Sequence, residues 1–309
     1  MIRELILDAS RSEAFRDHVA HSSALRRAAH RFLPGEELED ALRVAAALWA
    51  QRIPVVLTRL GESVESADAA AGTSRHYIAV LDSTANLDLP ADVSVKLTQL
   101  GLSLGDAACL DNLIPIADRA VKHGRTLWLD MEDSSLTEAT LRLYEALRVG
   151  YDDIGIALQA NLRRTPEDLE RLLPLQPLVR LVKGAYRESA EVAHTRRDDV
   201  NGAYLQLAAD LLSWSAAGRA RPVFATHDME LLGRIQQLAT ALGAGPHGYE
   251  VHMLYGIRSA DLERLARDGT RTRVLISYGP DWAAWYLRRL AERPANIALA
   301  ATSLLAKRR

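Results

Sequence analysis

Short runs of β-branched and other apolar residues recur along most of this chain, and segments with helical spacing of apolar residues separate them. Eight runs of five or six residues follow residue 51, about thirty residues apart: 53–57, 93–97, 126–130, 154–159, 178–182, 222–226, 249–254 and 272–276. Such runs are typical of buried strands in parallel sheets. Eight strands that alternate with helices predict an α/β fold, a (βα)8 barrel of the TIM type.

Helical spacing is clearest between the fifth and sixth runs. One buried stripe there comprises Val200, Ala203, Tyr204, Leu207, Leu211 and Trp214. The first fifty residues also have a helical pattern, and the apolar residues from Leu38 to Trp49 are spaced to bury one face. We therefore predict an N-terminal helical arm at residues 1–50, packed on a barrel domain at residues 51–309.

Length, composition and charge narrow the class of protein. With 309 residues and 48% hydrophobic content, the chain is large enough for one extensive core. Its 38 basic and 40 acidic residues are dispersed, so we expect no nucleic-acid partner. Cys109 is the only cysteine, which excludes an internal disulfide and fits a reducing cytoplasm. No segment approaches the ~20 apolar residues of a membrane span, and we expect a cytoplasmic protein.

Polar residues stand at the predicted end of every strand: Glu62, Lys96, Asp130 with Glu132, Gln159, Lys183, His227, His252 and Tyr278. In a (βα)8 barrel these ends meet at one rim, where ligands bind. A single polar strand end is commonly structural, but all of them together favour a functional site. Neither His227 nor His252 has a second histidine close by on its strand, and cysteines do not cluster, so we expect no catalytic metal.

The fifth strand ends in the most specific local signal, VRLVKGAY. Arg180 and Val182 point to the same side of the strand, and Lys183-Gly184-Ala185 leaves it through a turn of small residues whose backbone N–H groups are able to face a cofactor. GxGxxG is absent, so a dinucleotide would be held without a Rossmann turn. A Schiff-base lysine, Lys183 or Lys96, is the competing enzymatic interpretation.

Near its end the chain carries two adjacent arginines in YGPDWAAWYLRRLAERPAN, residues 278–296. Helical spacing places Trp285, Arg288, Arg289 and Glu292 on one face. A pair of guanidinium groups suits both oxygens of one carboxylate, so this face is a candidate substrate clamp. A solvated helix face with an ion pair is the alternative.

Motifs along the whole predicted barrel carry a family resemblance. In order they are LGESV (60–64), SVKLTQLG (94–101), LDMED (129–133), LQA (158–160), RLVKGAY (180–186), FATHD (224–228), MLYGIR (253–258) and RRLAERPAN (288–296). The sequence resembles the monofunctional bacterial proline dehydrogenases, and it is similar to the barrel domain of bifunctional proline-utilisation flavoproteins. The resemblance implies oxidation of L-proline to 1-pyrroline-5-carboxylate by hydride transfer to non-covalent FAD, the first step of proline catabolism, with a quinone as electron acceptor.

The resemblance also implies roles for single residues around the substrate. Arg288, Arg289 and Lys96 would bind the carboxylate, and Asp130 would orient one arginine. Glu62 would pair with Arg288 as a gate. Further substrate contacts would come from Tyr186, Leu254 and Glu292.

For the cofactor, the resemblance places Arg180 beside the reactive nitrogen of the flavin, so that Asp130 and Arg180 are the expected catalytic residues. The FAD would be held by Met131, Gln159, Val182, Lys183, Gly184, Ala185, Thr226 and His227. Thr195 and Arg197 would reach its pyrophosphate or ribose.

Some positions depart from the family pattern, and they concern the substrate. Leu275 stands where the eighth strand usually has a tyrosine on the substrate ring, and Trp285 replaces another tyrosine. Thr58 and His252 stand where aspartate and glutamine are common. Proline is the first choice of substrate, and 4-hydroxyproline or another secondary-amine amino acid is the alternative. A Schiff-base lyase and a non-catalytic amino-acid-binding barrel are the alternatives from other classes.

The last segment, residues 297–309, is apolar and then basic. This composition is typical of a weak interfacial anchor, which would suit peripheral membrane contact and a quinone acceptor. A helix that covers the barrel fits the same residues equally well.

Overall fold

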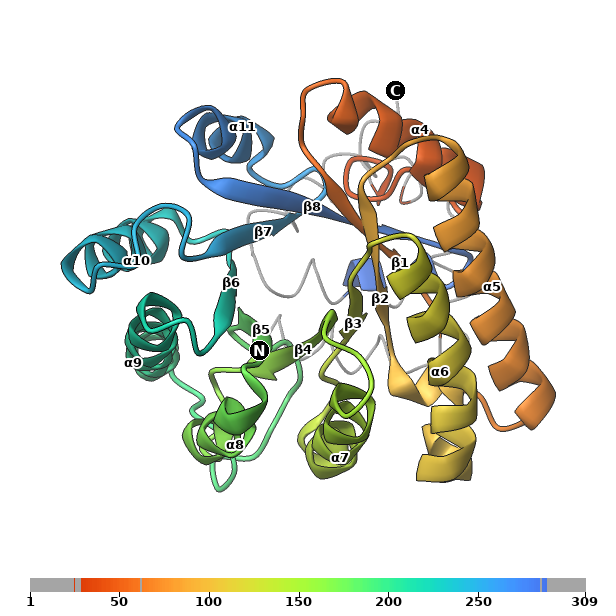
Figure 1. Ribbon diagram of the computed structural model, residues 1–309, viewed down its shortest axis with the longest axis horizontal. Coiled ribbons are helices and arrows are strands. Elements are labelled where there is room, and N and C mark those ends of the chain that lie inside the picture. Colours follow the sequence, from red (N-terminus) through yellow and green to blue (C-terminus); the bar gives the residue numbers. More distant parts are fainter. Residues whose placement is uncertain (1–24, 26–28, 62, 284, 288–309) are drawn as a thin grey trace, which may run out of the picture.

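The computed structural model describes residues 25, 29–61, 63–283 and 285–287. Eight parallel strands pair in sequence order and close into a barrel, with β1 joined to β8 (Figure 1). The strands are β1 Val55–Arg59, β2 Ala91–Val95, β3 Leu127–Leu129, β4 Ile154–Gln159, β5 Leu178–Val182, β6 Arg221–Ala225, β7 Glu250–Leu254 and β8 Arg271–Tyr278. The predicted (βα)8 barrel is confirmed, and no predicted strand end is displaced by more than two residues.

Helices surround the barrel on its outside (Figure 1). They are α4 Leu38–Trp49, α5 Ala67–Asn86, α6 Asp106–Lys122, α7 Thr137–Arg148, α8 Thr165–Leu172, α9 Arg197–Ala216, α10 Met229–Ala241 and α11 Ser259–Arg267. Short 3-10 helices lie at η1 Leu97–Leu100, η2 Leu102–Leu104, η3 Ser134–Leu136 and η4 Leu173–Leu175. Two of the described α-helices begin with a side-chain cap: Ser66 accepts from Ala69 N before α5, and Asp228 accepts from Leu231 N before α10.

The main core lies between the strands and the helices. Outward-facing strand residues such as Leu57, Leu129 and Phe224 are fully buried in it. Ala41 and Ala45 of α4 belong to the same core, since α4 packs on β1 and β8. Part of the predicted arm thus shares its core with the barrel, and the boundary at residue 50 stays a prediction.

A second apolar cluster joins the start and the end of the described chain. Ala29 and Leu33 pack with Leu60, Trp282 and Tyr286. The segment that carries Ala29 and Leu33 also passes close to Gly256, where φ is +74° and a Cβ would lie 1.8 Å from the carbonyl oxygen of Arg31. The segment before α4 is therefore held against the loop that follows β7.

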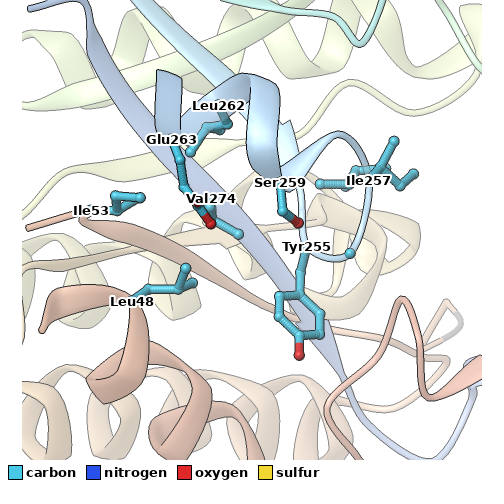
Figure 2. Close-up of a pocket in the computed structure, with 10 residues that line it drawn as sticks. Leu48, Ile53, Tyr255, Ile257, Ser259, Leu262, Glu263 and Val274 are labelled. Atoms are coloured by element: carbon cyan, nitrogen blue, oxygen red, sulfur yellow. The ribbon is translucent and has the colours of Figure 1, made fainter. Parts of the chain in front are cut away.

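A small cavity lies between α4, α11 and β8, next to the loop that follows β7 (Figure 2). Its volume is about 40 Å³, and its lining includes Leu48, Ile53, Leu262 and Val274. This space holds a few water molecules at most, so it cannot bind an amino acid or a dinucleotide. Across the described ranges, no helix is both long and apolar enough to traverse a bilayer.

Candidate functional site

Three side chains from different strands meet inside the mouth of the barrel. Arg180 on β5 donates from Nη2 to Ser94 Oγ on β2 at 2.7 Å, and it forms an ion pair with Asp130, which follows β3. The Ser94 hydroxyl donates to Asp130 Oδ1 at 2.8 Å. The strand periodicity explains the meeting, because Ser94 and Arg180 occupy inward positions while their neighbours face the helices.

Arg180 is only 2% exposed, and a buried charge requires a partner. Burial lowers the pKa of its guanidinium, while Asp130 and Asp92 act in the opposite direction. An arginine stays protonated in a protein, so the ion pair with Asp130 is what makes this burial tolerable. Its Nη1 is buried, and the N–H groups of this atom have no hydrogen-bond partner among the described residues.

Glu132 organises the ends of β3 and β4. Its carboxylate accepts from the backbone N–H of Thr98 at 3.1 Å and from the Thr98 hydroxyl at 2.8 Å. Burial raises the pKa of Glu132, and the two bonds from Thr98 oppose that shift. Its carbonyl oxygen accepts from Gln159 Nε2 at 2.8 Å, so the buried Gln159 amide at the end of β4 is held in place.

The ends of β5 and β6 are joined by an ion pair. Lys183 Nζ lies 2.8 Å from Asp228 Oδ2 and 2.7 Å from Asn201 Oδ1, and Arg197 Nη2 lies 3.4 Å from the same Asp228 oxygen. Burial would raise the pKa of Asp228, but the hydrogen bonds from Lys183 and from Leu231 N hold it at about 2. The carboxylate is therefore ionised at neutral pH.

The turn after β5 is shaped by a glycine and an asparagine. Gly184 has φ +104°, and a Cβ there would lie 2.0 Å from Asn161 Oδ1. Only glycine fits this close approach. Asn161 Oδ1 is itself buried and lacks a hydrogen-bond partner within the described chain, so the turn presents an acceptor next to exposed backbone.

The ends of β6 and β7 are linked through a histidine. His227 Nε2 accepts from the backbone N–H of Leu254 at 2.9 Å, which places the ring proton on Nδ1. Two residues before Asp228, the Thr226 hydroxyl accepts from the Asp228 N–H at 3.1 Å. Both predicted cofactor residues of the FATHD motif are thus fixed by backbone contacts.

Most predicted site residues for which the structure gives a position lie at the barrel mouth. Besides those above, Lys96 directly follows β2, Met131 follows β3, Val182 ends β5, and Ala185 and Tyr186 continue its turn. Leu254 and Leu275 are register partners on β7 and β8. Trp285 is buried in the second apolar cluster, against which Leu254 packs. Glu62, Arg288, Arg289 and Glu292 lie outside the described residues.

His252 is not at a strand end, and Tyr278 ends β8 as predicted but does not face the barrel mouth. His252 lies in the middle of β7 and points into the barrel, where its ring meets Trp128 with centroids 5.5 Å apart. Tyr278 turns outward, and its hydroxyl lies 2.7 Å from His76 Nε2 on α5. Strand periodicity could have placed Tyr278, but the depth of His252 depends on the stagger of the strands, which the sequence does not specify.

Several residues of the site had no predicted role: Ser94, Trp128, Asn161, Asn201 and Asp228. The inward position of Ser94 could have been predicted, because it lies two residues before Lys96 and therefore faces the same side of the strand. Asn201 is 18 positions from Lys183 along the chain, so only the folded loop brings them together.

The fold and the site together define a (βα)8-barrel protein with a cluster of partly buried, charged side chains at the C-terminal rim of the strands. The family model that matches this chain is proline dehydrogenase, over residues 41–299. Proline dehydrogenase 2 of Bacillus subtilis (strain 168) is 34% identical over 298 residues, 96% of this chain and 97% of that protein. The proline dehydrogenase of Deinococcus radiodurans is 34% identical over 282 residues, 90% of each chain.

Solved structures agree with this relationship. Proline utilization A from Bdellovibrio bacteriovorus, inactivated by N-propargylglycine, is similar with a TM-score of 0.80 and 25% sequence identity. The match covers 87% of this chain and 33% of that one, so this chain spans about a third of that protein. The chain belongs to the proline dehydrogenase family and is an oxidoreductase, which confirms the resemblance.

Proposed function

We propose that this protein oxidises L-proline to 1-pyrroline-5-carboxylate with a bound, non-covalent FAD, and that a quinone takes up the electrons. The full-length similarity to proteins named proline dehydrogenase supports the substrate. The observation that carries the proposal is the Arg180 guanidinium at the barrel mouth, which Asp130 holds while Nη1 has no partner in the described chain. Asp130 and Arg180 are the proposed catalytic pair.

The residues present fit a flavin dinucleotide. Gly184 allows a close approach to the backbone, while Arg180 Nη1 and Asn161 Oδ1 offer a buried donor and a buried acceptor. We assign the cofactor to Met131, Gln159, Val182, Lys183, Gly184, Ala185, Thr226 and His227. A bound flavin supplies a hydride acceptor for the carbon beside the substrate nitrogen. Arg180 is placed to stabilise negative charge that develops on its ligand.

The chain's own residues would orient the substrate. We propose that Arg288, Arg289 and Lys96 bind its carboxylate, that Glu62 closes over the site, and that Glu292 supports the arginine pair. Fixing the carboxylate at two guanidinium groups holds the reacting carbon in one orientation. Several positive charges around the amine also disfavour its ammonium form, which cannot release a hydride.

Apolar residues would cover the ring of the substrate and exclude water. We assign this contact to Tyr186, Leu254, Leu275 and Trp285. Leu254 packs against the cluster that contains Trp285, so both belong to one apolar wall of the site.

We further propose that residues 1–50 form an N-terminal arm. Residues 297–309 would form a peripheral membrane contact of a cytoplasmic protein.

The absorption spectrum of the purified protein tests this function. Bound flavin gives a band near ~450 nm that bleaches when proline is added without oxygen. Arg289→Met should raise KM for proline steeply at unchanged flavin content, because the lost group contacts the substrate. Arg264→Met, on the exposed side of α11, is the matched control and should leave KM unchanged. A colourless protein, or an unaltered KM in Arg289→Met, would contradict the proposal.

A second substrate has one observation in its favour. Leu275 is partly buried against Val56, Trp128 and Val223 inside the barrel, so the eighth strand presents a small apolar side chain where the family has a tyrosine. A smaller residue leaves room for a substituent on the substrate ring. We therefore keep 4-hydroxyproline, or another secondary-amine amino acid, as the alternative substrate.

A further inference from the structure

The interior of the barrel below its mouth contains charged and aromatic side chains. Bulky branched residues dominate this region in most (βα)8 barrels. Here the inward positions of five strands carry Asp92, Trp128, Arg180, Glu250, His252 and Arg273. Their contacts join strands that are not neighbours in the barrel, such as β3 and β7, so the side chains meet in its interior.

Two carboxylates are linked through one arginine in this group. Arg273 Nη1 lies 3.3 Å from Asp92 Oδ2, and Arg273 Nε lies 2.8 Å from Glu250 Oε1. The same Glu250 oxygen lies 3.2 Å from His252 Nε2. Burial would raise the pKa of Glu250, but the bond with His252 and the charge of Arg273 hold it at about 2. Burial lowers the pKa of His252, while the bond with Glu250 and its charge act in the opposite direction.

The indole of Trp128 is held between these groups. Its Nε1 donates to Asp92 Oδ2 at 3.3 Å, and the His252 ring meets it edge-on, with an interplanar angle of 71°. Gly155 on β4 leaves the space for the indole, since a Cβ there would lie 2.4 Å from Cε3 of Trp128. Contacts from three strands therefore define one position for this ring.

The indole in turn supports Arg180. The Cζ atom of Arg180 lies 4.8 Å from the centre of the Trp128 ring, within the range of a cation–π contact. Ser94 and Asp130 bind only Nη2, so they fix one edge of the guanidinium. The plane of the group, and with it the direction of the Nη1–H donor, depends on the indole.

We propose that His252 is a positioning residue for the oxidation: it holds the Trp128 indole against Arg180, so that the Nη1–H donor keeps one direction toward the bound ligand. This inference rests on the proposed function, in which Arg180 lies beside the flavin. Misplacement of a group by about 1 Å can cost roughly 100-fold in rate, so a residue that never touches the substrate can control turnover in this way.

The test compares His252→Ala and His252→Gln with the unaltered holoenzyme. His252→Ala should lower kcat for proline by about tenfold or more while KM changes by less than about twofold, because no substrate contact is lost. The reduction potential of the bound flavin should shift in the same variant. His252→Gln keeps a donor for Glu250 and fills space beside the indole, so it should recover most of the rate.

A matched control separates positioning from packing. His76 is a partly buried histidine that bonds to Tyr278 outside the barrel wall, and His76→Ala should leave kcat and the flavin potential unchanged. An unchanged kcat in His252→Ala, or an equal loss in His76→Ala, would overturn the inference. A structural role alone would lower the melting temperature of His252→Ala without changing kcat or the potential.

A crystal structure of His252→Ala tests the inference through a readout that does not depend on the cofactor. The Trp128 indole and the Arg180 guanidinium should both leave their positions, whereas an unmoved pair would overturn the claim. A wild-type protein that took up no flavin would instead defeat the proposed function. The two failures are therefore distinguishable.

Discussion

Lys183 Nζ lies 2.8 Å from Asp228 Oδ2 and joins the ends of β5 and β6. A second bond, to Asn201 Oδ1 at 2.7 Å, holds the same nitrogen from α9. A Schiff-base lysine must instead offer its amine to a carbonyl carbon. The contacts of Lys183 therefore favour a structural role over the lyase chemistry that the sequence also allowed.

Borohydride trapping tests this assignment. When the protein is treated with sodium borohydride in the presence of a small ketone, mass spectrometry should find no adduct at Lys183, since both partners already engage its nitrogen. Lys183→Met provides the background of non-specific labelling at other lysines. A stoichiometric adduct that disappears in this variant would return the lyase to consideration.

The pH dependence of stability should report the same ion pair. The pKa of Asp228 is about 2 in the folded chain, below its usual value of about 3.9, so the folded state favours the ionised form. The stabilisation is complete above the unfolded pKa and is lost as the pH falls toward 2. Asp228→Asn keeps a residue able to cap α10, yet it should reduce the free energy of unfolding at pH 7 and have a smaller effect below pH 3.

Urea denaturation across this pH range measures the effect. In the Lys183→Met background the cost of Asp228→Asn should be smaller, because the ionic partner is already missing. Equal costs in both backgrounds would show that the pair contributes nothing to stability.

The fit between Gly155 and Trp128 predicts a loss of stability. A Cβ at residue 155 would lie 2.4 Å from Cε3 of the indole, and the ring has little freedom to move. Gly155→Ala should therefore destabilise the protein by about 1–3 kcal/mol, as overpacking of a core does. Gly202→Ala on α9 meets open space and should stabilise by up to about 1 kcal/mol. Urea unfolding of the two variants compares them directly.

The position of Leu275 predicts a change of substrate preference. Leu275→Tyr would fill the apolar space beside Trp128 and exclude a substituent on the substrate ring. The ratio of kcat/KM for proline to that for trans-4-hydroxyproline should rise about tenfold, the range of one altered apolar contact. Leu275→Met, similar in volume, should leave the ratio unchanged. A ratio unaffected by the tyrosine would remove Leu275 from the substrate site.

The strands and much of the rim could be predicted from the sequence because their signals are local. Residues 154–158 carry no polar side chain, which is typical of a strand covered on both faces. Lys96, Asp130 and Lys183 directly follow β2, β3 and β5, so the fold places them at the mouth. The roles expected for these three residues came from the family resemblance, because their order along the chain does not indicate what each side chain binds.

Contacts across the barrel could not be predicted in this way. Arg180 and Ser94 are 86 residues apart, and their bond depends on the closure and stagger of the whole sheet. His252 shows the same limit, because its alternation indicates an inward side chain but not how deep it lies. The Asn161 acceptor, which has no hydrogen-bond partner among the described residues, likewise takes its place only when the turn at Gly184 folds over it.

The ions beneath the mouth have a consequence for protein engineering. In most (βα)8 barrels, bulky branched apolar side chains fill the interior beneath the catalytic loops. Here Asp92, Glu250 and Arg273 connect the floor of the barrel to Trp128 and hence to Arg180. Loops taken from this protein and grafted onto a barrel with an aliphatic interior would lack the side chains that support Arg180. The loops and the barrel interior therefore have to be transferred together.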